Sequence, residues 1–394
     1  MIRRDLLKLA ATMPFFLLAP GPVELFAAPA TPVRGRWDRV LILIELHGGN
    51  DGLNTLVPYS DERYAQVRPH LAIPRERVLQ LSPAIGLHYA LEPLMSLWEK
   101  QQLAIVQGVG YPDPNRSHFR SIEIWDTASA SHQVLDEGWL ARLFEIYPLP
   151  AEFAADGIVL GQRDGGPLSG KTVRTIALQD TQQFLQQASQ VKAAEQSSSN
   201  RALAHILQVQ RELTHAAADL ADRMQHVPAL QTTFPASPIG HQLETAARLL
   251  TARVPVAVIK VSQTGFDTHA GQLGHHERLL KELAESLVAF RLAMVQAGLW
   301  DRVLMMTYSE FGRRVGENAS AGTDHGTAAP HFFLGGSVKG GLYGGMPSLS
   351  DLQEGDLKYR VDYRSLYATV IRSWWGISEA AVVGLEYQPV NCLA

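Results

Sequence analysis

The feature that most constrains the fold is a set of separate apolar runs, rich in β-branched residues, each followed by a polar, glycine-containing loop. These runs cover 40–46, 103–106, 254–261 and 303–308. Near-continuous apolar runs of this length are typical of strands buried on both faces, so they predict a parallel sheet. Helical spacing at Leu91–Trp98 and over 279–290 indicates helices that pack on it. The expected fold class is therefore α/β, with one mostly parallel sheet and helices on both faces.

Composition excludes several classes of protein. The chain has 394 residues, enough for one large α/β domain or two smaller ones. With 46% hydrophobic and 19% charged residues it is expected to be globular, and its net charge of −4 gives no reason to expect nucleic acid or an anionic membrane as partner. Because Cys392 is the only cysteine, no intramolecular disulfide can form, and a metal site must use other ligands.

The first thirty residues are expected to be an export signal that is not part of the fold. Arg3 and Arg4 precede a short apolar core over 9–18, and small residues over 27–30 offer a cleavage site. The apolar run is too short, and too interrupted by proline, to span a membrane as a helix. The paired arginines resemble the twin-arginine signal, which implies the twin-arginine export machinery as partner and a periplasmic or extracellular location. An uncleaved membrane anchor is the alternative.

The composition changes over 179–237, where Gln and Ala dominate and leucines recur at helical spacing around a break at Ser197–Asn200. We interpret this stretch as a helical insertion of two helices on the outside of the sheet. Two further short strands are expected before it, at Ile158–Leu160 and Thr175–Leu178.

Carboxylate and imidazole groups collect directly after three of the expected strands. Loops at the carboxyl ends of parallel strands are where α/β proteins place their chemistry. These are also ligand types that suit zinc, manganese and other divalent ions. Each motif alone has an ordinary explanation as a turn or a cap, but their repetition at three strand ends favours a shared site. The groups are Asp51, Asp267, His269, Glu310, Asp324, His325 and, at the start of the last apolar run, His331.

A further candidate region follows the run at 103–106. There Ser117 lies at the expected start of a helix over 118–128. A Ser in this position is most simply an N-cap. The free N–H groups and the helix dipole also favour negative charge, and so an oxygen nucleophile or a metal-bound hydroxyl. Arg116 could bind an anionic substrate group through two hydrogen bonds. With His118 beside them, Ser117 and Arg116 are the catalytic candidates.

Four longer motifs, at 47–59, 108–119, 265–269 and 309–326, resemble a family of exported bacterial proteins, domain-of-unknown-function family 1501. The resemblance covers essentially all of 31–394, which is expected to be a single domain. The family is similar in layout to the alkaline phosphatase and sulfatase superfamily. That similarity implies a doubly wound, alkaline phosphatase-like fold with a divalent-metal site at the strand ends.

The superfamily resemblance also implies individual roles. Asp51 matches the acidic ligand after the first strand, Ser117 the hydroxyl nucleophile, and Asp267 with His269 a metal-holding pair. The pair Asp324-His325 resembles a second one, but the preceding strand ends at Glu310, so either acidic residue is a candidate for that ligand position.

The implied function is an exported, metal-dependent hydrolase of phosphate or sulfate esters in which Ser117 attacks phosphorus or sulfur. The cofactor would be a divalent ion (zinc, manganese, calcium or magnesium), and the substrate a small-molecule or surface ester. One alternative is a non-catalytic exported binding protein that keeps the fold. Another is a metal-dependent hydrolase of a different kind of bond.

Overall fold

The computed structural model describes residues 35–153, 155–178, 222–223 and 229–394. The expected export signal lies outside these residues, as does most of the insertion expected over 179–237. The described residues after Val33 belong to one compact unit. None of the helices in this described part of the chain is long and apolar enough to cross a membrane.

The centre of this unit is one large sheet with the strand order β11-β5-β10-β9-β1-β8-β6-β7, in which β14 also pairs with β5. Its strands are β1 (Val40–His47), β5 (Leu103–Gly110), β6 (Gly157–Leu160), β7 (Thr175–Leu178), β8 (Val258–Thr264), β9 (Val303–Tyr308), β10 (Ala329–Gly335), β11 (Gly341–Tyr343) and β14 (Val361–Asp362). Among the described strands of this sheet, β10 alone runs antiparallel to its neighbours, β5 and β9, and the other pairs in the sheet are parallel. The expected mostly parallel sheet is confirmed.

Two expected elements differ in detail. The strand predicted over 254–261 begins at Val258, since Pro255 has no N–H to donate to a neighbouring strand. The helix predicted at Leu91–Trp98 is a 3₁₀ turn followed by α3 (Met95–Glu99), because Pro93 cannot donate within a regular helix.

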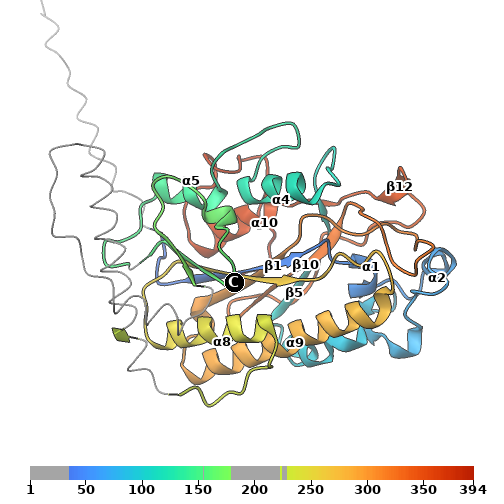
Figure 1. The fold of residues 1–394 in the computed structure, drawn as a ribbon, viewed down its shortest axis with the longest axis horizontal. Coiled ribbons are helices and arrows are strands. Elements are labelled where there is room, and N and C mark those ends of the chain that lie inside the picture. The colour runs from blue at the N-terminus through green and yellow to red at the C-terminus, as the bar shows by residue number, and fades with distance from the viewer. Residues whose placement is uncertain (1–34, 154, 179–221, 224–228) are drawn as a thin grey trace, which may run out of the picture. The chain divides into compact units, whose positions relative to one another are not determined.

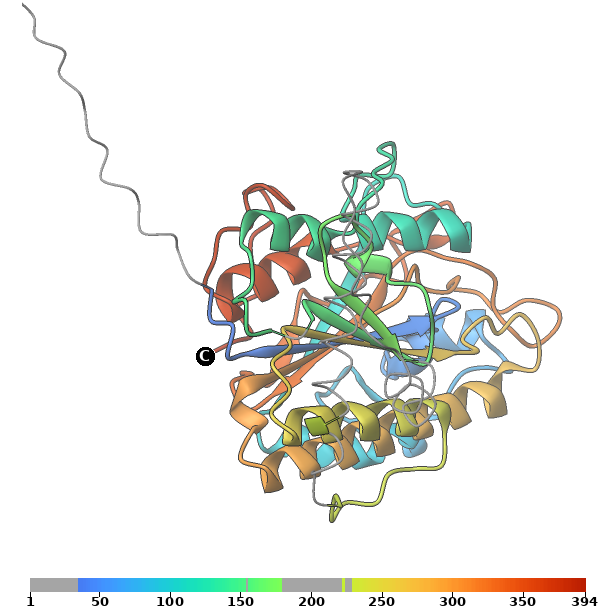
Figure 2. The same ribbon diagram turned by 60° about the vertical axis from the view of Figure 1, so that its left-hand side comes forward.

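Helices cover both faces of the sheet (Figures 1 and 2), as expected for a doubly wound fold. On one face lie α8 (Pro238–Thr251) and α9 (Gln272–Gln296), and on the other α4 (His118–Thr127), α5 (Trp139–Ile146) and α10 (Arg364–Ala368). Successive side chains of a strand point to opposite faces. Ile42 and Ile44 therefore pack in the core under α8 and α9, whereas Leu41 and Leu43 pack in the core under α4 and α5.

The remaining described elements are short. They are α1 (Gly52–Thr55), β2 (Leu56–Val57), α2 (Glu62–Val67), β3 (Leu79–Gln80), β4 (Gly86–Leu87), β12 (Leu352–Gln353), β13 (Asp356–Leu357), 3₁₀ turns at Arg75–Arg77, Tyr89–Leu94, Gly166–Leu168 and Trp300–Arg302, and a π-helical turn at Thr369–Trp374.

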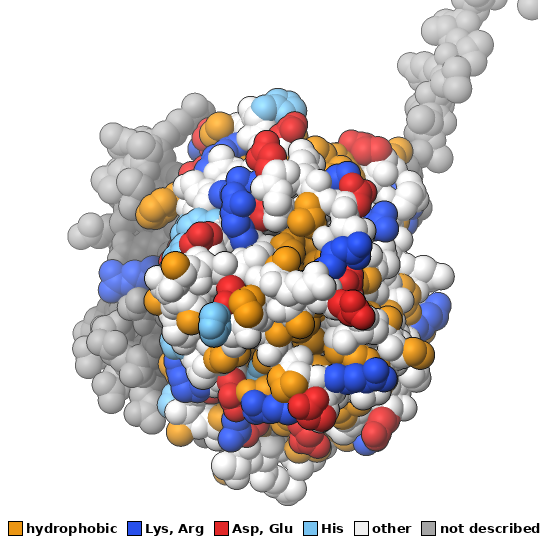
Figure 3. All heavy atoms as spheres, turned by 90° about the vertical axis from the view of Figure 1, so that its right-hand side faces the viewer, with side chains coloured by type: hydrophobic (Ala, Val, Ile, Leu, Met, Phe, Trp, Pro, Cys, Tyr) orange, Lys and Arg blue, Asp and Glu red, His pale blue; other side chains and the backbone are white. Residues whose placement is uncertain are grey.

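The carboxyl ends of the three central strands lie at the same edge of the sheet. In the parallel registers, His47 at the end of β1 pairs with Thr264 at the end of β8, and Glu45 pairs with Tyr308 at the end of β9. The loops that follow these strands therefore begin side by side. Figure 3 views the molecule from this side and shows histidine and acidic side chains at the surface.

Candidate metal centre

Three imidazoles and one carboxylate converge where the loops after β8 and β9 meet the start of α4. His118, Asp267 and His325 each place one ligand atom within 4.8 Å of the others. The Oδ1 atom of Asp267 lies 3.4 Å from His118 Nε2, 3.3 Å from His325 Nε2 and 3.0 Å from His269 Nε2. Ligand atoms held about 2.0–2.2 Å from a tetrahedral ion lie about 3.3–3.6 Å apart. The cluster thus has nearly the spacing of a metal's ligand shell.

Each of the three rings is oriented by a hydrogen bond at its other nitrogen. The pairs are His118 Nδ1 with Glu310 Oε1 at 2.7 Å, His325 Nδ1 with the carbonyl of Arg116 at 2.7 Å, and His269 Nδ1 with Asp324 Oδ1 at 3.0 Å. Because all three partners are acceptors, Nδ1 carries the proton and Nε2 is left with a lone pair. Metal-ligating histidines are held in this way.

The resulting contacts fit a bound cation. The Nε2 atoms of His269 and His325 lie 2.9 Å apart, although both are acceptors in this arrangement. His118 Nε2 is buried and has no hydrogen-bond partner among the described residues. Burial lowers the pKa of His325, which keeps its ring neutral and able to act as a ligand. The donor set of imidazole nitrogen and carboxylate oxygen is chemically suited to zinc or manganese.

Arg313 ties the cluster to the surrounding loops. Its fully buried guanidinium donates to the carbonyls of Gly49 and Thr323, each at 2.8 Å, and to Asp267 Oδ1 at 2.5 Å. Burial acts in the other direction, but the hydrogen bond from Arg313 lowers the pKa of Asp267 to about 2, so this carboxylate is ionised. Arg313 was not among the predicted site residues. The signal that could have found it is an arginine pair directly after an apolar strand.

The two alternative acidic ligands, Glu310 and Asp324, both lie behind imidazoles. Glu310 is buried and also accepts a hydrogen bond from the backbone N–H of Gly48 at 2.8 Å. Asp324 also accepts from Asn318 Nδ2 at 3.1 Å. In this structure both carboxylates therefore orient rings that face the cluster.

Asp51 is not brought into the cluster. Its carboxylate caps α1 by accepting from the N–H groups of Leu53 and Asn54, and it pairs with Arg68 Nη1 at 2.6 Å. Gln272 Nε2 donates a further hydrogen bond to the Asp51 carboxylate. Complete burial alone would raise the pKa of Asp51, but the charge of Arg68 outweighs this effect and lowers it. Asp51, which was expected to be a metal ligand, thus lies in a helix cap and a buried ion pair, apart from the imidazoles around Asp267.

The catalytic candidates at the start of α4 separate in the structure. Ser117 is exposed, and its hydroxyl makes no capping hydrogen bond to α4. The guanidinium of Arg116 pairs with the buried Asp356 at 2.5 Å, so its charge is not free for a substrate anion. His118 faces the metal cluster. His331 lies elsewhere, buried in β10, where desolvation lowers its pKa to about 3.

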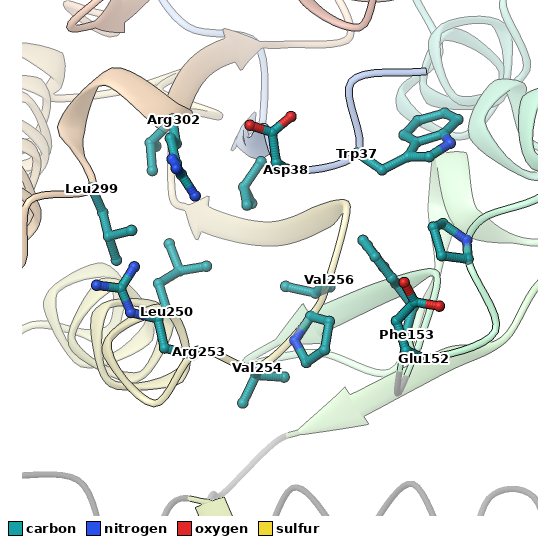
Figure 4. Close-up of a pocket in the computed structure, with 14 residues that line it drawn as sticks. Trp37, Asp38, Glu152, Phe153, Leu250, Arg253, Val254, Val256, Leu299 and Arg302 are labelled. Carbon is teal, nitrogen blue, oxygen red and sulfur yellow. The ribbon is translucent and has the colours of Figure 1, made fainter. Parts of the chain in front are cut away.

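Two cavities flank the sheet at opposite ends. One of about 410 Å³ (Figure 4) is lined by residues such as Trp37, Val40 and Val303, at the amino ends of β1 and β9. It thus lies at the end of these strands opposite the cluster around Asp267. A second cavity of about 410 Å³ is lined by Tyr111, Arg116 and Thr327 among others, and Arg116 connects it to the cluster.

A family model described as "Protein of unknown function (DUF1501)" matches residues 79–383. The chain belongs to this family. The family membership expected from the motifs is thereby confirmed. No curated protein matches the sequence of this DUF1501 chain.

The fold of the DUF1501 chain is similar to several solved structures, all at low sequence identity. The lipoteichoic acid synthase LtaP from Listeria monocytogenes is 8% identical with a TM-score of 0.34, over 78% of this chain and 66% of that one. The PsFucS1 sulfatase from Pseudoalteromonas sp. is 9% identical (TM-score 0.41; 90% and 72% covered). A protein in the alkaline phosphatase superfamily from Vibrio parahaemolyticus is 10% identical (TM-score 0.37; 88% and 68% covered). These likenesses are distant, and they concern the fold.

Proposed function

We propose that this chain is an exported, metal-dependent hydrolase of phosphate or sulfate esters with Ser117 as its nucleophile. The observation that carries the proposal is the convergence of three imidazole Nε2 atoms on Asp267 Oδ1, with every Nδ1 held by an acceptor. The ligands would be His118, Asp267, His269 and His325. When bound, such an ion polarises the oxygen atoms of an ester and stabilises the negative charge that develops on them.

The position of Ser117 supports its role as nucleophile. It directly precedes His118, is exposed, and leaves its hydroxyl free of a cap bond to α4. The N–H groups and the dipole at the start of this helix stabilise an oxygen that is losing its proton. The same helix end, next to a cation site, favours an anionic group over a neutral ester, which supports phosphate or sulfate as the group attacked.

The remainder of the substrate has room in the cavity beside Arg116. Its walls include Tyr111 and Tyr359 as well as Gln353. Its cationic side chains have acidic partners, because Arg116 pairs with Asp356 and Lys358 pairs with Asp351. Since Asp113 and Glu354 also line this cavity, we infer that the alcohol part of the ester carries no negative charge.

The test combines metal analysis with an activity assay. The protein exported in its native host should contain close to one metal ion per chain and should hydrolyse p-nitrophenyl phosphate or p-nitrophenyl sulfate. Asp267→Ala and His325→Ala should lose the metal, whereas Ser117→Ala should keep the metal and lose hydrolysis. His241→Ala changes an exposed histidine outside the cluster and is the matched control.

Two results would contradict the proposal in different ways. Stoichiometric metal without hydrolysis of either ester would favour the non-catalytic binding protein. Absence of metal from the native protein, with normal folding, would remove the basis for any metal-dependent reaction.

A further inference from the structure

A histidine–carboxylate pair beside the metal centre has no role in the chemistry described so far. His47 ends β1, and its Nδ1 lies 3.1 Å from Glu45 Oε1. The ring centroids of His47 and His118 are 6.3 Å apart. The side chain of His47 is 46% exposed, whereas that of Glu45 is 5% exposed. With Nδ1 bonded to Glu45, Nε2 is the ring nitrogen that remains available to another partner.

Buried charges hold Glu45 in place. Lys260 Nζ lies 3.1 Å from Glu45 Oε2, and Gln162 Nε2 donates to the same oxygen at 3.3 Å. Burial opposes ionisation, but the hydrogen bond with His47 and the charge of Lys260 lower the pKa of Glu45 to about 2. Glu45 therefore stays a carboxylate, and it keeps the proton of His47 on Nδ1.

This arrangement is costly if its role is only structural. Burying an ion pair such as Glu45 with Lys260 carries a desolvation penalty that well-packed apolar side chains would avoid. An exposed pair of histidine and glutamate, by contrast, would need no buried lysine behind it. The buried charges have a clear use if they hold Nε2 of a half-exposed imidazole toward a substrate, as in a general acid–base pair.

We propose that His47 is the proton donor to the leaving alcohol, an inference that rests on the proposed ester hydrolysis. Ser117 Oγ forms a bond to phosphorus or sulfur as the bond to the alcohol oxygen breaks, and the electron pair stays on that oxygen. The protonated His47 gives the Nε2 proton to this oxygen, and the Ser117 proton is released to solvent. A water molecule then attacks phosphorus or sulfur and gives a proton to His47, and the Ser117 oxygen leaves and regains a proton from solvent.

The experiment compares two esters of the same acid that differ in their alcohol. Nitrophenolate leaves readily without a proton, whereas phenolate benefits more from one. His47→Gln should lower kcat/KM for the phenyl ester by about 10²–10⁴-fold, the usual size of general acid catalysis. It should lower kcat/KM for the p-nitrophenyl ester much less. Metal content should not change, and His241→Gln should match the wild type on both esters.

The outcomes separate the two levels of inference. If the wild type cleaves neither ester, the proposed hydrolase fails and His47 loses this role with it. If the wild type is active and His47→Gln loses the same factor on both esters, or loses none, the proton-donor role is wrong while the hydrolase stands. Loss of metal from His47→Gln would also overturn it, because the residue would then be a part of the metal site.

Discussion

At the residue scale, the candidate metal centre depends on atoms that do not face Asp267 Oδ1. Glu310, Asp324 and the carbonyl of Arg116 decide which nitrogen of each ring is free. Replacing partners of this kind typically lowers metal affinity by about 10–100-fold, because they fix both the tautomer and the ring orientation.

Glu310→Gln should therefore weaken metal binding although Glu310 is not a proposed ligand. His118 Nδ1 and the N–H of Gly48 both bond to Oε1 of Glu310, so a glutamine can keep this acceptor, but it removes the negative charge that makes His118 a more basic ligand. We expect about 10–100-fold lower metal affinity, measured by competition with a chromophoric chelator. Asp324→Asn, which can keep an acceptor oxygen for His269, should cost less than Asp324→Ala. Equal affinities for Glu310→Gln and the wild type would contradict the proposed orientation.

A second prediction concerns Asp126, which lies in α4 near Lys260. Burial raises the pKa of Asp126 to about 8 from its ordinary value of 3.8, against the opposing charge of Lys260. A carboxyl that is protonated when folded and ionised when unfolded makes stability fall as the pH rises from about 4 to about 8. Asp126→Asn should remove this slope, so the variant should gain stability relative to the wild type between pH 5 and pH 8.5. Urea unfolding at the two pH values measures the free energy of unfolding of both proteins. A difference between variant and wild type that is the same at both pH values would contradict the raised pKa of Asp126.

At the element scale, three strand ends are joined by contacts between their loops. Gly48 follows β1 at a φ of +117°, and a Cβ there would lie 2.4 Å from the backbone nitrogen of Asp267. Arg313, after β9, donates to the loop after β1 and to Asp267 after β8. The position of Asp267 thus depends on all three strands.

Arg313→Lys should lower metal affinity even though it keeps the positive charge. A lysine ammonium cannot reproduce the planar set of donors that reaches Gly49, Thr323 and Asp267 together. We expect at least about 10-fold weaker metal binding and faster backbone hydrogen exchange in the loops at 265–271 and 322–326. Arg314→Lys is the matched control, since Arg314 makes a long 3.4 Å contact with the Glu354 carbonyl. Unchanged exchange and affinity in Arg313→Lys would contradict this role.

At the scale of the whole molecule, the sheet places the proposed chemistry at one end, while the cavity of Figure 4 lies at the other end of β1 and β9. The compact unit that is described follows the residues expected to direct export. The twin-arginine pathway carries proteins that are already folded, so under the proposed function the metal would be bound before export.

Replacing Arg3 and Arg4 together by lysine should leave the precursor in the cytoplasm of the native host. The reason is that the paired arginines are the part of the signal that the export machinery recognises. Cell fractionation followed by immunoblotting measures the result, with Lys8→Arg as a control that changes a basic residue outside the pair. Unchanged recovery of the double variant from the periplasm would exclude twin-arginine export.

The sequence by itself determined the strands and the chemistry of their loops. β1 and β9 could be predicted from near-continuous apolar runs, because a strand that is buried on both faces is apolar at nearly every position. Asp267, His269 and His325 could be selected because they follow such runs. The start of α4 at His118 could be placed as well, since Pro112 and Pro114 break regular structure just before it.

Only the tertiary structure decided how these groups are used. Asp51 meets Arg68 and Gln272, which are 17 and 221 residues away in the chain, and it is thereby removed from the metal cluster. His118 is turned toward Asp267 by Glu310, 192 residues away. The antiparallel β10 lies between β5 and β9, which the apolar pattern does not indicate. A side chain's partners depend on which distant segments pack against it, and periodicity and turn signals describe only the near neighbours in the chain.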